Sequence, residues 1–183
     1  MPFRSRRLRP AVLLLTTALV AGGVGGCSAL APFTTCEGTE DRLRELDSLP
    51  LLASAPPGAK AAPGDAGAYA ECVDDSGDAW LSARRLYFYP GSEQEVLAHY
   101  RRAAEDGGWQ VHTPAWPFAD PALELCFTQG PEGGARQATV HFVSRRLLHE
   151  VYRLPPNRES ARGLAFEIEA GSESDGSSSS CWD

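Results

Sequence analysis

Three acidic side chains crowd one short stretch of the sequence, CVDDSGD, and could bind a cation. Asp74, Asp75 and Asp78 offer the carboxylate oxygens that calcium prefers. The calcium-binding loop, however, spreads its ligands over about twelve residues and closes on a glutamate, and this stretch lacks that pattern. The competing interpretation is an ordinary turn rich in Asp, Ser and Gly, and we expect no metal and no other cofactor.

The histidines could hold zinc, but their spacing does not favour it. Zinc sites on a helix use paired histidines, as in H-E-x-x-H, and the sequence has no such pair. We therefore expect solvated or structural roles for His99, His112, His141 and His149.

Hydrolytic and nucleotide chemistry would be indicated by short motifs that this sequence lacks. It contains no G-x-S-x-G, no S-x-x-K, and no glycine pattern for nucleotide phosphates. We therefore assign no catalytic residue. A Ser-His-Asp arrangement can still be assembled from distant residues, so a hydrolase with an unrecognised site stays open as an alternative.

Aromatic side chains are the remaining candidates for binding. Tyr87 and Tyr89 share one face of an expected strand, and Trp109 and Trp116 follow within a short distance along the chain. If exposed together, such rings would bind a cell-wall glycan or an envelope protein. The alternative is that they form the core and its rim.

The N-terminus has the features of an export signal. Residues 1–10 carry four arginines and no acid, and the apolar run 11–20 is only half the length that a membrane span needs, about 20 residues. Small residues then lead to a cysteine in Val24-Gly25-Gly26-Cys27. This stretch resembles the lipobox of bacterial lipoproteins. The resemblance implies that residues 1–26 are removed and that the Cys27 thiol carries a diacylglyceryl group, with palmitate-type chains holding the protein on the outer face of the cell membrane.

The chain that begins at Cys27 is strongly acidic. Its 13 basic and 24 acidic residues give a formal charge of −11, which excludes nucleic acid as a natural partner. The membrane is then contacted through the lipid rather than by charge. The chain has a single lysine, isoleucine and asparagine among many Ala, Gly, Arg and Pro residues, a bias that indicates GC-rich coding and an actinobacterial source.

The sequence has five cysteines, so one of them cannot form a disulfide within the chain. Lipidation of Cys27 leaves an even set of four: Cys36, Cys72, Cys126 and Cys181. Outside the cytoplasm these should be oxidised, and three pairings exist. As a hypothesis we favour Cys36–Cys72, which would tie an N-terminal helix to the domain. The same pairing leaves Cys126–Cys181, which would fix the Ser-rich tail to a strand.

The pattern along the chain predicts an α+β fold with two helices, 37–48 and 93–106. Ser92 and Glu95 have the capping-box arrangement at the start of the second helix, and Gly107 suits a left-handed position at its end. Alternating apolar residues predict strands at 80–89, 109–113, 123–129, 137–144 and 163–170, with Glu167 and Glu169 facing outward. The segment 145–162 is ambiguous.

These elements predict an antiparallel sheet of about four to five strands, covered by one main helix and stapled by disulfides. The expected organisation is a signal peptide at 1–26, a lipidated cysteine and tether at 27–35, one domain at 36–170 with a loop or linker at 50–68, and a flexible tail at 171–183. Residues 70–130 resemble small uncharacterised actinobacterial lipoproteins, which mostly lack an assigned activity. The expected role is therefore a binding or assembly module of the cell envelope, more probable for this sequence than an enzyme.

Overall fold

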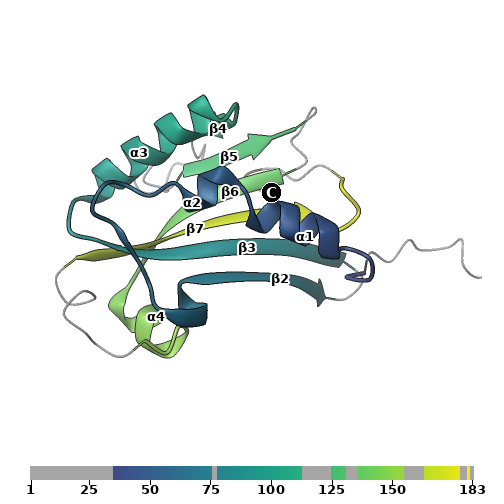
Figure 1. The fold of residues 1–183 in the computed structure, drawn as a ribbon, viewed down its shortest axis with the longest axis horizontal. Coiled ribbons are helices and arrows are strands. Elements are labelled where there is room, and N and C mark those ends of the chain that lie inside the picture. The colour runs from purple at the N-terminus through teal and green to yellow at the C-terminus, as the bar shows by residue number, and fades with distance from the viewer. Residues whose placement is uncertain are drawn as a thin grey trace, which may run out of the picture. The chain divides into compact units, whose positions relative to one another are not determined.

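Strand β3, Asp78–Tyr89, is the longest of the described strands and lies next to one edge of the sheet (Figure 1). It combines Trp, Leu, Tyr and Phe with few turn-forming residues, a composition that fits a strand buried on at least one side. The computed structural model describes residues 35–75, 78–112, 125–130, 136–154, 163–177 and 181. All of these residues belong to one compact unit, Thr34–Asp183.

The described strands form one seven-stranded sheet, and every pair of neighbours is antiparallel. From β3 the order runs through β7 (Leu164–Glu173), β6 (Arg136–Val143), β5 (Leu125–Gln129) and β4 (Gln110–His112). On its other side, β3 pairs with β1 (Lys60–Ala61) and β2 (Ala68–Asp75) at different points along its length.

The sheet is therefore larger than the four to five strands that the sequence predicts. The additional strands, β1 and β2, lie in segments whose Ala, Gly, Pro and Asp content indicates loop. They form because β3 offers backbone hydrogen bonds along its whole length, and strand pairing depends on such context more than on intrinsic preference. The segment 50–68 also contains a helix, α2 (Pro50–Ala53), and a single 3-10 turn, Gly64–Ala66. At the other end, β7 continues to Glu173, into the expected flexible tail.

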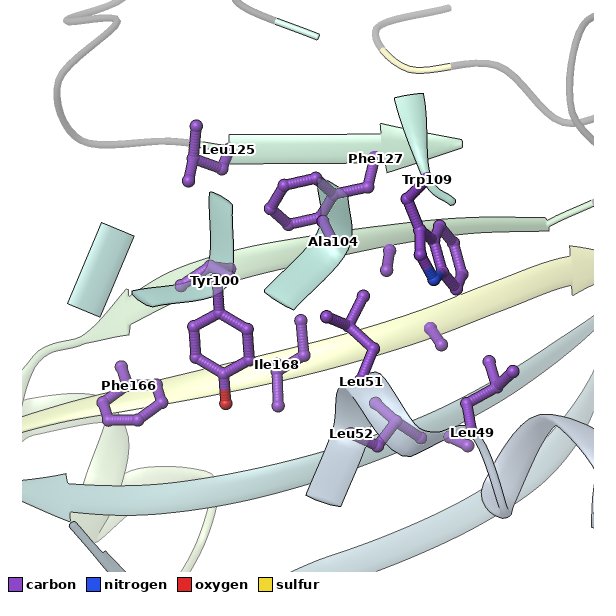
Figure 2. Packing of buried hydrophobic residues seen from close by; sticks show 14 of the residues in the cluster. Leu49, Leu51, Leu52, Tyr100, Ala104, Trp109, Leu125, Phe127, Phe166 and Ile168 are labelled. Atoms are coloured by element: carbon purple, nitrogen blue, oxygen red, sulfur yellow. The ribbon is translucent and has the colours of Figure 1, made fainter. Parts of the chain in front are cut away.

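One face of the sheet carries the main hydrophobic core. Three helices contribute buried residues to it: α1 (Glu40–Asp47), α2 and α3 (Glu93–Asp106). Figure 2 shows the leucines around α2 facing the same cluster as Tyr100 and Trp109. Coverage of the face thus comes from three helices: α3, the main covering helix that the sequence predicts, α1, which lies within the predicted short helix 37–48, and α2.

Helix α3 begins and ends by local signals. The Ser92 hydroxyl accepts a hydrogen bond from the Glu95 amide, and the Glu95 carboxylate accepts one from the Ser92 amide, so the predicted capping box is confirmed. The left-handed residue at the end is Gly108, with φ of 73°, and not Gly107, with φ of −83°. The amide of Trp109 bonds back to the Ala104 carbonyl at 2.8 Å, so the helix keeps its predicted bounds, 93–106, and only the left-handed residue lies one position later than predicted.

The opposite face of the sheet is covered at one end by α4, Arg145–Glu150, which falls in the segment that the sequence leaves ambiguous. Ser144 caps this helix through a bond from the Leu147 amide. Leu148 is buried and packs with Leu86 and Phe88 of β3 in a second, smaller apolar cluster.

Candidate functional site

Two disulfides join the described cysteines: Cys36–Cys72 and Cys126–Cys181. They are the two pairings that the sequence analysis favours. The first connects the residues before α1 to β2, and the second connects β5 to Cys181 beyond the end of β7. Disulfides persist in oxidising compartments, so they indicate an extracytoplasmic location. Cys27 lies outside the described residues.

The acidic stretch occupies the connection between β2 and β3. Asp74 is on β2 and Asp78 opens β3; both are exposed, and Asp75 is opposite Asp78 in the strand register. Within the described ranges, no three His, Cys, Asp or Glu side chains are grouped so that they could hold a metal ion.

The aromatic candidates are buried. Tyr87 and Tyr89 on β3 and Trp109 after α3 are each less than 10% exposed and belong to the main core. Tyr87 stacks on Phe166 and donates its hydroxyl to the Leu52 carbonyl at 3.0 Å. These three rings therefore form no exposed aromatic patch and belong to the core and its rim, the alternative that the sequence leaves open. Trp116 lies outside the described residues.

The histidines are dispersed over the fold, and three have hydroxyl partners. His112 contacts Thr128 at 2.8 Å and His141 contacts Thr139 at 2.7 Å, in both cases on the face opposite α3. His149 is exposed on α4. His99 on α3 differs from the others because it borders a cleft.

This cleft, called here the α2–α3 cleft, has a volume of about 610 Å³. Its apolar lining comes from α2 and its approach, with Leu49, Pro50 and Leu51, and from Trp109. Its polar lining comes from α3 and the end of β5: His99, Arg102, Asp106 and Gln129. The Gln129 amide is already engaged, since it donates to the Gly107 carbonyl at 2.9 Å.

A hydroxyl and an imidazole meet inside the α2–α3 cleft. The Ser54 Oγ lies 2.9 Å from Nε2 of His99, although 45 residues separate them. Burial lowers the pKa of His99, and the positive charge of Arg102 lowers it further, while hydrogen bonding to Ser54 opposes the shift. His99 is therefore neutral at pH 7, the form that can accept a proton from a hydroxyl. Among the described residues, no carboxylate is recorded within hydrogen-bond distance of His99.

A polar network lies on the other face of the sheet, beside α4. The Tyr152 hydroxyl donates to the Glu167 carboxylate at 2.7 Å, and the Ser82 hydroxyl donates to Glu169 at 2.6 Å. The sequence predicts that Glu167 faces outward. In the structure it is only 5% exposed, because α4 and Tyr152 cover this part of the sheet. Burial raises its pKa, although the Tyr152 bond and the charge of Arg84 oppose the shift.

Sequence reasoning missed both the Ser54–His99 pair and the Tyr152–Glu167 bond. Ser54 stands in an Ala- and Pro-rich segment that indicates loop, and no motif relates it to His99. The single available signal at Glu167 is the alternation of β7, which places every second residue on one face but does not show that α4 and Tyr152 cover this face.

No described helix is long and apolar enough to cross a membrane. Comparison with known proteins gives no match: no family model fits the chain, and no curated protein and no solved structure is detectably similar to it. The function of the protein is therefore inferred from its own residues and their geometry.

Proposed function

We propose that this protein is a lipid-anchored module on the outer face of the cell membrane and that its α2–α3 cleft binds a small amphipathic molecule. The cleft carries the proposal. Its volume of about 610 Å³ falls in the range of ligand sites, roughly 300–1,000 Å³. It also has the composition of such sites, with several apolar side chains and a few polar groups that would fix orientation.

In the polar lining, Arg102 favours an acidic head group and Asp106 disfavours one, so the proposed position of the head group is beside Arg102. Arg102 carries a permanent charge and can form paired hydrogen bonds with a carboxylate or phosphate. His99 and Ser54 lie beside it and add hydrogen-bonding groups without a charge, because the lowered pKa keeps His99 neutral. Leu49, Leu51 and Trp109 would contact an apolar tail.

A charge series of short-chain amphiphiles tests this binding site. Dodecanoate, dodecanol and dodecylamine are titrated into the full chain in phosphatidylcholine nanodiscs, with binding followed by calorimetry. We expect dodecanoate to bind best and Arg102→Gln to weaken it at least tenfold. Arg101→Gln, at an exposed position on the same helix and outside the cleft lining, is the matched control and should bind normally. Equal binding of all three amphiphiles, or equal loss in both variants, would contradict the proposal.

The anchor rests on Val24-Gly25-Gly26-Cys27 and is tested separately from the cleft. Protein extracted from its native membrane should have an intact mass that starts at Cys27 and includes acyl groups. Reduction should add the mass expected for two disulfides. Cys27→Ser should release the protein from the membrane. A lipid-free mass with Met1 retained would overturn the anchoring, whatever the cleft binds.

A second candidate function is ester hydrolysis, and one observation favours it. Ser54 and His99 have the separation of a nucleophile and its base, and they lie in a cleft large enough for a substrate. Hydrolysis of p-nitrophenyl butyrate and labelling by a fluorophosphonate probe would both depend on Ser54. We expect Ser54→Ala to abolish them if the pair is catalytic, whereas Ser48→Ala, at an exposed position, should not change them. Absence of labelling in the wild type would exclude this candidate.

A further inference from the structure

The outer edge of β2 is open. Strand β2 pairs with β3 along its whole length, Ala68–Asp75, and no described strand pairs with its other side. Figure 1 shows β2 at the border of the sheet. An open edge presents a row of backbone donors and acceptors that can pair with another chain.

The register identifies which backbone groups point outward. The Leu86 amide donates to the Gly67 carbonyl, and the Leu86 carbonyl accepts from the Ala62 amide, so both backbone groups of Leu86 point toward β1 and β2. Every second residue of β3, from Asp78 to Phe88, has the same orientation. Their partners on β2, which include Tyr69 and Val73, direct their amides inward. The outward groups therefore belong to the alternate residues Ala68, Ala70, Cys72 and Asp74.

This edge lacks several of the usual protections against pairing, and its acidic side chains would deter acidic rather than basic partners. Natural sheets shield their edges with short strands, prolines, lysines or bulges. β2 has eight residues, contains neither proline nor lysine, and keeps continuous register with β3. The Cys36–Cys72 disulfide also fixes the middle of the strand, so the edge is held in an extended form before any partner arrives.

The side chains along β2 define the chemistry of a partner. Tyr69 and Val73 are 40% and 43% exposed, and they lie on the same side of the strand. Glu71 lies between them and accepts a bond from the Tyr69 hydroxyl at 2.8 Å. With Asp74 exposed on the other side, the edge combines apolar contact area with negative charge.

We propose that β2 accepts an extended segment of a partner protein as an eighth strand, and that every second residue of this segment, on the face of Tyr69, Glu71 and Val73, is in turn apolar and basic. Main-chain hydrogen bonds would supply affinity, and alternate side chains would supply specificity. The apolar residues of the partner would contact Tyr69 and Val73, and the basic residue between them on the same face would approach Glu71. A second copy of this chain fits less well, because it would bring its own Glu71 and Asp74 against the same charges. This inference goes beyond the cleft and does not depend on it.

Two peptides test the proposal on the full chain in phosphatidylcholine nanodiscs. One carries valine and lysine in turn at every second position, the other carries valine and glutamate in turn, and serine stands between them in both. Both peptides are seven residues long with blocked ends. Fluorescence anisotropy should show binding of the lysine–valine peptide and at least tenfold weaker binding of the glutamate–valine peptide. Hydrogen exchange should slow at the Ala70, Cys72 and Asp74 amides and nowhere else in the sheet. Equal binding of both peptides, or protection elsewhere, would overturn the proposal.

Two variants separate edge pairing from general charge attraction. Ala70→Pro removes one outward amide without removing a β2–β3 bond, and should abolish binding of the lysine–valine peptide. Glu71→Lys should reverse the preference between the peptides and remains informative if the proline variant does not fold. Glu105→Lys, at an exposed position on α3, makes the same charge change away from β2 and should leave the preference intact. Binding unaffected by a folded Ala70→Pro variant, or a dimer of the chain that this variant dissociates, would contradict the proposal.

Discussion

The phenol of Tyr152 donates a hydrogen bond of 2.7 Å to the carboxylate of Glu167, on the sheet face that α4 covers at one end. Glu167 is 5% exposed, and three further ionisable groups act on it: Arg84, Glu169 and His141. Arg84 in turn lies over the ring of Tyr69, 4.9 Å from its centre. The electrostatic environment of the Glu167 carboxyl is therefore set by charged or ionisable side chains on β3, β6 and β7 and by Tyr152, which follows α4.

The raised pKa of Glu167 makes stability depend on pH. A carboxyl whose pKa is higher in the folded state stabilises the fold at acid pH, and this contribution is lost as the pH rises through the folded-state pKa. We expect the wild type to lose free energy of unfolding relative to Glu167→Gln as the pH rises from the ordinary glutamate pKa, about 4.3, through neutrality. Urea denaturation across this range measures the difference. Glu105→Gln should follow the wild type, and parallel profiles for all three proteins would contradict the assignment.

The Tyr100 hydroxyl is buried without a hydrogen-bond partner among the described residues. Its ring lies edge-on to Phe166, with centroids 5.8 Å apart, in the core that Figure 2 shows. Because an unpaired buried hydroxyl costs about 1–3 kcal/mol, Tyr100→Phe should stabilise the protein by an amount on that scale. Tyr87→Phe is the matched control and should destabilise it by about 1 kcal/mol, since it loses the bond to Leu52. Destabilisation by Tyr100→Phe would mean that the hydroxyl is satisfied.

The two disulfides should contribute comparable stability. They join residues 36 and 55 positions apart, and loops of these lengths correspond to about 4 kcal/mol each in the chain-entropy model. Replacing both cysteines of either pair with alanine should lower the free energy of unfolding by about that amount, as measured by urea denaturation. Peptide mapping without reduction checks the pairing itself, and a Cys72–Cys126 peptide would refute it.

The indole of Trp80 packs against the backbone of Gly171 on the neighbouring strand. A Cβ at position 171 would overlap the Trp80 ring, so Gly171→Ala should destabilise the fold by about 1–3 kcal/mol. Thermal denaturation should also show that Trp80→Val recovers part of this loss, because the smaller side chain removes the overlap. No recovery in the double variant would show that the glycine is needed for another reason.

Local signals in the sequence predict the parts of this fold that depend on local interactions. The capping box of α3 and the alternation of β5, β6 and β7 all involve residues within a few positions of each other. β2 could not be predicted in this way, because AYAECVDD has little strand preference and is extended by its pairing with β3. The candidate site is less predictable still. Ser54 and His99 meet because α2 and α3 pack on one face of the sheet, and no local pattern encodes that contact.

The Cys36–Cys72 bond determines where mechanical force would enter the domain. Tension on the chain before Cys36 passes through the disulfide into β2 and across the sheet, so α1, which begins at Glu40, carries none of it. If Cys27 is the lipidated residue, the eight residues between it and Cys36 allow the two cysteines to lie at most about 30 Å apart when fully extended. The domain would then be held close to the bilayer through β2, and a pull on the lipid would load the sheet rather than unfold the helix.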